Sequence, residues 1–300
     1  MNQSLAIINP AAGAGRCGRE VVAAIAALKE RGVTTEVWYT REAGHASALA
    51  QQGYEQGFRN FIAIGGDGTA FEIINGFGPA FGKRGAERVR LGFLPLGTGN
   101  SFIRDAGVLT MDQALTRLAA GRSRPCDVVR VTHAQGVVYS LNILSFGFVA
   151  EVCRLTEQRF KALGHAGYGL AVLAKLGRLR PLSLGLRIDG GETWEQPLLV
   201  ASINNSQFTG GNMPIAPFAD FADGKLDLLL VKPVNPLTFL RLFAKMFTGK
   251  HVHQPQVTTA QASRLTCRFP GPIDAMIDGE VMQLDVHEIS VVPAALDVSL

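Results

Sequence analysis

Three glycines and a threonine surround a single acid in the segment Gly65-Gly66-Asp67-Gly68-Thr69. It follows Asn60 to Ile64, which we expect to be a buried strand, and precedes Ala70 to Phe77, which has a helix pattern. Glycine permits a tight turn and lets phosphate approach bare backbone at a helix N-terminus. Asp67 would then lie beside the phosphates, where a carboxylate is repulsive unless it holds Mg²⁺ or receives a hydrogen bond. The alternative is a structural turn with a capping aspartate.

Two other segments of small residues also lie between a predicted strand and a predicted helix. The first, Asn9-Pro10-Ala11-Ala12-Gly13-Ala14-Gly15-Arg16, is neither a Walker A loop nor a GxGxxG motif, and taken alone it is better explained as an ordinary glycine-rich turn than as a phosphate loop. The second, Leu94-Pro95-Leu96-Gly97-Thr98-Gly99-Asn100-Ser101, ends in hydroxyl and amide groups that can meet phosphate or ribose. Because parallel strands end at one edge of a sheet, we expect the loops at 65–69 and 94–101 to converge on one crevice.

The elements that position these loops alternate between strand and helix patterns. Strands are expected at Leu5 to Asn9, Val33 to Thr40, Asn60 to Ile64 and Leu91 to Leu94, and helices at Cys17 to Arg31, His45 to Phe58, Ala70 to Phe77 and Met111 to Gly121. Such alternation is typical of a parallel sheet with helices on both faces. The first part of the chain is therefore predicted to be an α/β nucleotide-binding domain.

The pattern changes near Arg124-Pro125 to strands at short intervals. They are expected at Asp127 to Thr132, Val137 to Leu144, Leu182 to Ile188, Pro197 to Asn205, Lys225 to Val231, Arg264 to Phe269 and Val286 to Val292. Helix patterns cover Ala150 to Leu179, with a break near Gly164, and Pro236 to Phe247. We therefore predict domains at 1–124 and 125–300, the second a β-rich sandwich, and leave open that the last residues return to the first domain.

Composition narrows the class of protein without choosing a ligand. The 300 residues are 47% hydrophobic, enough for two domains with their own cores. The four cysteines form no CxxC pair, so neither a zinc site nor a disulfide framework is indicated. No secretory signal or membrane span is evident, and we expect a soluble, cytoplasmic protein. The net charge of +4 suits an anionic partner, which leaves nucleic acid, ATP and a membrane surface open.

Taken together, the motifs resemble the diacylglycerol kinase catalytic-domain family, which includes bacterial lipid kinases, sphingosine kinases and ceramide kinases. The matching segments are Asn9-Pro10-x-x-Gly13, Gly65 to Thr69 with Glu72 and Asn75-Gly76, Pro95 to Asn100, the Asp-Gly-x-Leu-Asp run at Asp223 to Asp227, and Asp278-Gly279-Glu280. These segments span essentially the whole chain. The resemblance implies an ATP-binding N-terminal domain and a β-sandwich that supplies a lipid pocket.

The resemblance also implies roles for individual residues in an ATP- and Mg²⁺-dependent transfer to a lipid hydroxyl. Asp67, Glu280 and Asp127 are the implied catalytic residues, with Glu280 engaging the acceptor hydroxyl; Asp67 and Asp223 are the implied magnesium ligands. The implied nucleotide contacts are Asn9, Pro10, Gly13, Gly65, Gly66, Gly68, Thr69, Glu72, Gly97, Thr98, Gly99 and Asn100. The plainer alternatives are an exposed turn acid for Glu280, a strand-edge salt bridge for Asp127, and solvated turn acids for Asp220 and Asp227.

One position departs from the family and one segment points to a membrane. Many bacterial relatives carry Asp after the Gly-Thr-x-Asn run, where this chain has Ser101, so diacylglycerol, ceramide and a long-chain base all stay open as acceptors.

The apolar segment Ala162 to Ala174 has basic flanks, including Lys161 and Lys175, and is expected either to dock on the anionic inner face of a membrane or to pack on the sandwich.

Three other functions are compatible with parts of the sequence. NAD kinase shares a Gly-Gly-Asp-Gly loop, but the Pro95 to Asn100 loop and the Asn9-Pro10 opening favour a lipid kinase. A catalytically silent nucleotide or lipid sensor would not require both Asp67 and Glu280. Nucleic-acid binding is supported only by the mild basic charge, since no basic and aromatic motif is present. The oligomeric state is not indicated.

Overall fold

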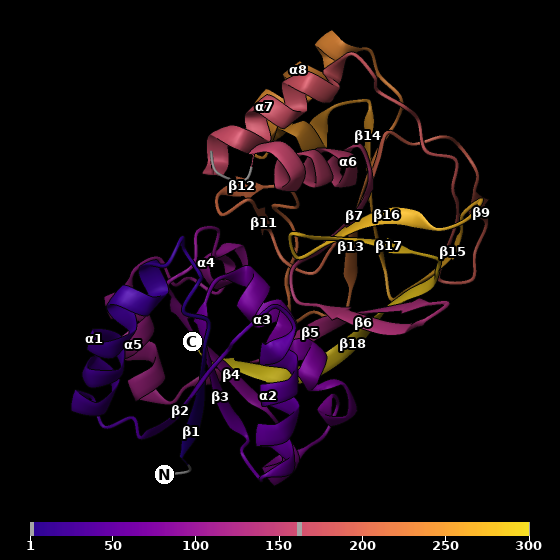
Figure 1. Cartoon of the computed structure of the whole chain (residues 1–300). Coiled ribbons are helices and arrows are strands. Elements are labelled where there is room, and N and C mark those ends of the chain that lie inside the picture. Colours follow the sequence, from indigo (N-terminus) through magenta and orange to yellow (C-terminus); the bar gives the residue numbers. More distant parts are fainter. Residues whose placement is uncertain (1–2, 161–163, 300) are drawn as a thin grey trace. The chain divides into compact units, whose positions relative to one another are not determined.

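The computed structural model describes residues 3–160 and 164–299, which form two compact units (Figure 1). Unit 1 comprises 1–128, 221–224 and 292–300, and unit 2 comprises 129–220 and 225–291. Two long strands, β5 (Ser123–His133) and β18 (Val286–Ser299), begin in one unit and end in the other. Each unit therefore contains distant parts of the sequence.

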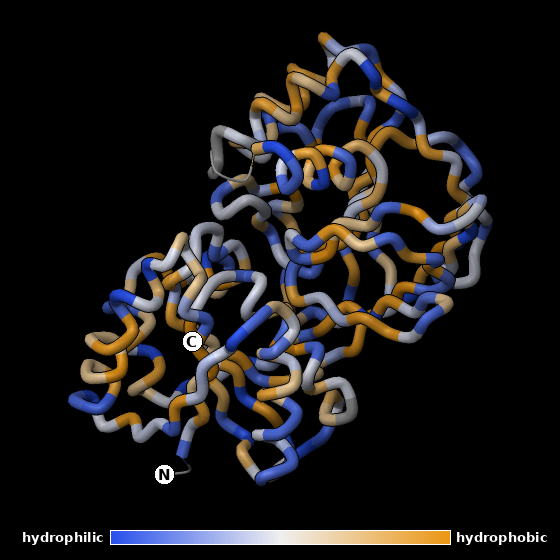
Figure 2. Tube along the Cα trace, in the orientation of Figure 1, coloured by the Kyte–Doolittle hydropathy of each residue, from blue (hydrophilic) through white to orange (hydrophobic). Residues whose placement is uncertain are grey.

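A parallel sheet forms the centre of unit 1. Its strands are β2 (Thr35–Tyr39), β1 (Ser4–Ile8), β3 (Asn60–Gly65) and β4 (Arg90–Pro95), in that spatial order. The end of β18 pairs in parallel with β4 through Asp297 and Val298. The strands β1, β3 and β4 are almost wholly buried, as expected for a sheet covered on both faces. In Figure 2 these strands are mostly coloured hydrophobic.

Helices cover both faces of this sheet. Figure 1 shows α1 (Arg16–Glu30) and α5 (Met111–Ala120) on one face, and α2 (His45–Glu55) and α3 (Asp67–Gly76) on the other. In α1 the buried residues recur every three or four positions, the period that turns one face of a helix to the core. Short helices add η1 (Gly78–Ala80), η2 (Gly85–Glu87) and α4 (Ser101–Asp105). The predicted α/β architecture is confirmed.

Unit 2 is built mainly from antiparallel strands. One sheet has the order β14 (Val257–Ala262), β13 (Leu226–Val231), β10 (Val200–Asn204), β7 (Ile143–Gly147), β16 (Ile273–Ile277) and β17 (Glu280–Leu284). Other pairings join β15 (Arg264–Arg268) to β8 (Gly185–Ile188) and β18, β8 to β9 (Thr193–Trp194), and β5 to β6 (Gly136–Ser140). A small hairpin joins β11 (Phe208–Thr209) and β12 (Met213–Pro214). The predicted β-sandwich is confirmed.

Helices lie against the six-stranded sheet of unit 2. They are α6 (Phe148–Leu155), continued by a π-helical turn at 156–160, then α7 (Gly164–Leu176), α8 (Pro236–Met246) and the 3₁₀ helix η5 (Lys250–His253). The side chain of Asn235 caps α8 by accepting from the Thr238 amide. Part of the predicted membrane-docking segment, residues 161–163, lies outside the described residues. In the described part of the chain, no helix has both the length and the apolarity to cross a membrane.

Several element boundaries differ from the sequence-based expectations. The single strand expected at Val137 to Leu144 is two strands, β6 and β7, because the chain turns at Leu141 and Asn142. The helix expected at Ala70 begins at Asp67, inside the glycine segment. Strands β14, β16 and β17 were not predicted, because polar residues interrupt their apolar runs.

Candidate functional site

The carboxyl ends of three strands in unit 1 are aligned. Ile8 at the end of β1 pairs with Ile64 of β3, and Gly65 at the end of β3 pairs with Pro95 of β4. The three predicted loops leave the sheet at these points, at 9–16, 65–69 and 95–101. The parallel register therefore brings all three loops together.

The second and third loops touch through bare backbone. The Gly97 amide donates to the Gly65 carbonyl at 2.7 Å, and a Cβ added to Gly97 would lie only 2.1 Å from the Cα of Gly66. Real Cβ atoms do not approach backbone this closely. Position 97 therefore requires glycine because the two loops pack closely there. The sequence motif alone does not reveal this reason.

The first loop is held to the third by a side chain and by close backbone contact. The Arg16 guanidinium donates through Nη2 to the carbonyls of Pro95, at 3.1 Å, and Gly97, at 2.9 Å. Gly13 adopts a positive φ, and a Cβ there would lie 2.5 Å from the Leu96 carbonyl oxygen. Arg16 was not among the predicted site residues, although its position at the start of α1 was a usable signal.

Asp67 is half-buried and bonds to the start of α4. Its Oδ2 accepts from the Ser101 amide at 2.9 Å and its Oδ1 from the Phe102 amide at 3.4 Å. Burial raises the pKa of Asp67 above its ordinary value, against the lowering effect of these amide hydrogen bonds. In the structure, the carboxylate of Asp67 receives hydrogen bonds from backbone amides, one of the two arrangements expected from the sequence.

The loops present features that suit an anion. Both α1 and α3 begin after a glycine, and neither has a capping side-chain hydrogen bond among the described residues. In α1 the amides of Arg16, Cys17 and Gly18 donate to carbonyls of the preceding loop, whereas α3 begins inside the glycine segment itself. The helix dipole makes such a terminus attractive to phosphate. Thr69 Oγ1 and Asn100 Oδ1 are buried and have no hydrogen-bond partner in the part of the chain that is described. These groups fit a nucleotide phosphate or ribose.

Other predicted residues of unit 1 bond to neighbouring backbone. Glu72 Oε2 accepts from the Ala46 amide at 3.0 Å, which ties α3 to the first turn of α2. Asn9 Oδ1 accepts from the Ala11 amide at 3.1 Å and so shapes its own loop.

Asp127 is 2% exposed and joins separate stretches of unit 1, although the sequence placed it just inside the second domain. Its carboxylate accepts from the amides of Gly224 and Ala294, each at 2.6 Å, and its own amide donates to the Phe221 carbonyl at 2.7 Å. Asp223 lies in the same short stretch as Gly224. Across 3–160 and 164–299, no three His, Cys, Asp or Glu side chains gather as a metal site.

In unit 2, a buried acid that was not predicted as a site residue organises the turn before Glu280. Asp278 is 7% exposed, and its carboxylate accepts from Ser140 Oγ at 2.6 Å and from the amides of Leu141, Asn142 and Ile143 at 2.8 to 3.0 Å. Burial raises the pKa of Asp278 to about 6, opposed by these hydrogen bonds. Glu280 itself is exposed at the start of β17. Asp278 therefore fixes the turn from which Glu280 projects.

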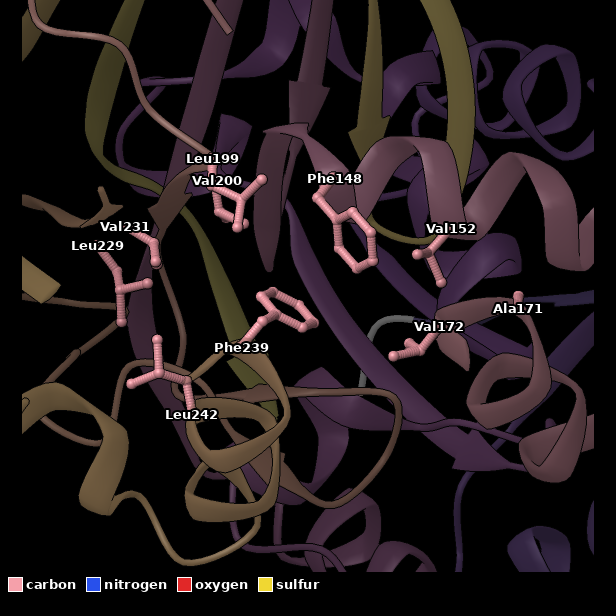
Figure 3. Close-up of a cluster of buried hydrophobic side chains, with 10 residues drawn as sticks. All are labelled: Phe148, Val152, Ala171, Val172, Leu199, Val200, Leu229, Val231, Phe239 and Leu242. Carbon is pink, nitrogen blue, oxygen red and sulfur yellow. The ribbon is translucent and has the colours of Figure 1, made fainter. Parts of the chain in front are cut away.

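The second notable site of unit 2 is an apolar cavity of about 60 Å³. Its walls come from α6, α7, α8 and one face of the six-stranded sheet, and they include Phe148, Val172, Val200, Leu229 and Phe239. Figure 3 shows these side chains directed toward one another, and the rings of Phe148 and Phe239 meet edge to face at 4.5 Å between centroids. The lining is apolar, which suits a hydrocarbon group of a ligand.

Two family models together match most of the chain. The diacylglycerol kinase catalytic domain matches residues 3–131, and the YegS C-terminal NAD kinase beta sandwich-like domain matches residues 142–300.

Curated relatives agree over nearly the full length. A diacylglycerol kinase of Mycobacterium tuberculosis is 31% identical over 299 residues, which cover 98% of this chain and 93% of the relative. A probable lipid kinase YegS-like protein of Xanthomonas oryzae is 30% identical over 92% of this chain and 90% of the relative. The crystal structure of a diacylglycerol kinase from Bacillus anthracis has the same fold, with a TM-score of 0.74 at 20% identity over 99% of this chain and 96% of that one.

These matches confirm the resemblance seen in the motifs. The order of the two matched domains agrees with the structure, in which an α/β unit with glycine loops precedes an antiparallel β-sandwich. The chain belongs to the lipid kinase family that is defined by the diacylglycerol kinase catalytic domain and the YegS-type C-terminal domain, and it is a kinase.

Proposed function

We propose that this kinase transfers the γ-phosphoryl group of Mg-ATP to a hydroxyl of a membrane lipid. The observation that carries the proposal is the assembly of three small-residue loops at the aligned ends of β1, β3 and β4. Such a surface of amides and helix N-termini at the carboxyl edge of a parallel sheet suits a nucleotide. Family membership supports the same activity.

The loops would hold the nucleotide mainly through backbone groups. The N-terminus of α3 would receive the phosphates. Thr69 Oγ1 would donate to a phosphate oxygen, and Asn100 Oδ1 would accept from a ribose hydroxyl. Asp67 and Glu72 would act indirectly. Asp67 bonds to the Ser101 amide and so holds the second and third loops together, and Glu72 bonds to the Ala46 amide and so holds α3 against α2. Arg16 would do the same between the first and third loops.

Mg²⁺ would bind to this kinase together with ATP. When bound, Mg²⁺ neutralises charge on the phosphate oxygens, and it usually keeps several waters and takes few protein ligands. The described residues offer no group of three candidate ligands. The magnesium roles of Asp67 and Asp223 therefore stay predictions, and no step is assigned to them.

The acceptor would be a lipid whose chain enters the apolar cavity of unit 2. Glu280 is proposed to accept the proton of the acceptor hydroxyl, since it is an exposed carboxylate on a turn that Asp278 holds rigidly. Diacylglycerol is the substrate in the names of several relatives. Because Ser101 stands where the resemblance implies an acid in many bacterial diacylglycerol kinases, ceramide and a long-chain base stay in the proposed set.

A membrane-facing surface is also part of the proposal. Large apolar side chains are exposed on α7, at Leu170 and Leu173, and on and after α8, at Leu237 and Phe247. Basic residues lie close by in the sequence, at Arg178, Arg180, Arg241 and Lys245. Exposed apolar groups with basic neighbours bind anionic bilayers. On this basis we propose that the enzyme acts at the inner face of the cytoplasmic membrane.

The test offers labelled Mg-ATP with diacylglycerol, ceramide, a long-chain base and, as a rival acceptor, NAD. We expect a phosphorylated lipid and no phosphorylated NAD. Labelled NAD would favour the NAD kinase alternative, and ATP binding without any transfer would indicate a catalytically silent protein.

Asp67→Asn should lower kcat for the lipid about 100-fold or more, because the loops lose a charged acceptor that orders both of them. Asp112→Asn is the matched control, since Asp112 is an exposed acid on α5 of the same unit. Circular dichroism should show both variants folded. Near-normal turnover of folded Asp67→Asn would remove Asp67 from the mechanism.

A further inference from the structure

His251 is a buried polar side chain that the proposed transfer does not use. It lies on η5, is 3% exposed, and lines the apolar cavity of unit 2. Its Nε2 is 2.9 Å from the Ile215 carbonyl oxygen. A carbonyl can only accept, so Nε2 must carry the hydrogen.

The other ring nitrogen of His251 is therefore an acceptor. Burial lowers the pKa of His251, which favours the neutral imidazole. With the hydrogen on Nε2, the neutral ring has a lone pair on Nδ1. Nδ1 is buried and has no hydrogen-bond partner among the described residues.

The surroundings of His251 offer little to satisfy that lone pair. The cavity walls are mostly aliphatic and aromatic, and they include Ile215, Met246 and Val257, which cannot donate a hydrogen bond. The one hydroxyl among the lining residues belongs to Tyr168, and it makes no hydrogen bond to Nδ1. A buried acceptor without a donor is unfavourable, so a ligand that brings an O–H group would gain an interaction that a plain hydrocarbon would not.

We propose that His251 makes this cavity selective for lipid chains that carry a hydroxyl group. The hydroxyl would donate to Nδ1 while the rest of the chain packs against the apolar walls. The inference rests on the proposed function, because it takes the cavity as the site of the acceptor chain. It adds a specificity-determining residue and a substrate class, the hydroxylated acyl or alkyl lipids.

The experiment compares pairs of acceptors that differ only in one chain hydroxyl, such as diacylglycerol with octadecanoyl chains or with hydroxyoctadecanoyl chains. The hydroxyl is moved along the chain across the series. For the best position, we expect kcat/KM to favour the hydroxylated lipid about 10-fold in the wild-type enzyme. A ratio near one at every position, as would follow if a water molecule satisfied Nδ1, would overturn the proposal.

Two variants separate the ring nitrogens. His251→Gln keeps an amide near the place of Nε2, able to donate to Ile215, but has no acceptor near the place of Nδ1. His251→Asn has the opposite arrangement, with its oxygen near the place of Nδ1. The preference should survive in His251→Asn and vanish in His251→Gln, and the reverse result would contradict the assignment. His253→Gln, an exposed position in the same helix, should keep the wild-type ratio.

A binding measurement separates this inference from the proposed function. If lipids are phosphorylated without discrimination, the inference alone fails. If no lipid is phosphorylated, the same lipid pairs are added as ligands and the shift in Tm is measured. A larger shift for the hydroxylated member, lost in His251→Gln, would still support the site, and equal shifts would refute it.

Discussion

The two units recognise their proposed ligands by different means. In unit 1 the loops meet through backbone, and side chains such as Asp67 and Arg16 hold those loops by bonding to amides and carbonyls. In unit 2 the cavity is shaped by side chains from three helices and a sheet. A backbone surface requires particular small residues at set spacings, whereas many sets of apolar side chains can line a cavity. The proposed nucleotide site can therefore be recognised from motifs in the sequence, whereas the proposed acceptor cavity cannot.

The largest effect is expected where backbone meets backbone. In Gly97→Ala the new Cβ would collide with Gly66, so the second and third loops must separate. Phosphoryl transfer should fall at least about 100-fold, because misplaced loops no longer hold the nucleotide in position. Lipid kinase assays and ATP titrations measure this.

The control for Gly97→Ala is Gly169→Ala in α7. A Cβ at Gly169 meets nothing within 4 Å, so this variant should transfer phosphate like the wild type. Normal activity in Gly97→Ala would show that the loop contact does not position the nucleotide.

A buried acid of unit 2 should give a pH-dependent stability. The pKa of Asp278 is raised to about 6 from an ordinary 3.8, so the folded state binds this proton more tightly than the unfolded state does. The contribution of Asp278 is thus most favourable below about pH 4 and is lost as pH rises through 6. The change is about 3 kcal/mol in the free energy of unfolding.

Urea unfolding between pH 4 and pH 8 tests this expectation. Asp278→Asn should remove this part of the pH dependence, because the amide does not titrate. Identical pH profiles for the variant and the wild type would mean that the four hydrogen bonds keep Asp278 ionised throughout.

A smaller and more selective effect is expected in the cavity. Phe239→Leu removes the aromatic contact with Phe148 but keeps an apolar side chain of similar reach. The KM for the lipid should rise several-fold, while the KM for ATP should stay the same, because the change lies in unit 2. Steady-state kinetics with each substrate varied in turn separate the two. A rise in the KM for ATP alone would contradict the division of roles between the units.

Much of unit 1 could be predicted from local pattern. The period of the apolar residues and the positions of the glycines placed β1, β3 and β4, and the helices α1, α3 and α5, within a few residues. The pattern did not predict α4, whose five residues are too few for a periodic signal. In unit 2 the strands β14, β16 and β17 were missed, because their burial depends on which face of the sandwich each residue meets.

The roles of the acids were harder to predict than their positions. The sequence motif of an aspartate between glycines is the same whether the carboxylate binds a metal ion or the amides of a helix N-terminus. That Asp67 bonds to α4 follows from the register that sets the end of β3 beside the end of β4. Asp278 bonds to a turn more than 130 residues earlier in the chain, which no local motif encodes.

The sequence alone determined the family, the α/β-then-β order and the three loops, because these depend on residue types at short spacings. Tertiary structure decided which groups each acid contacts. Asp67 bonds to the start of α4, Asp127 joins distant segments of the chain, and Asp278 holds the turn that precedes Glu280. It also created the cavity that contains His251. The physical reason is that hydrogen bonds and packing join residues that are close in space, and only the completed fold brings these distant residues together.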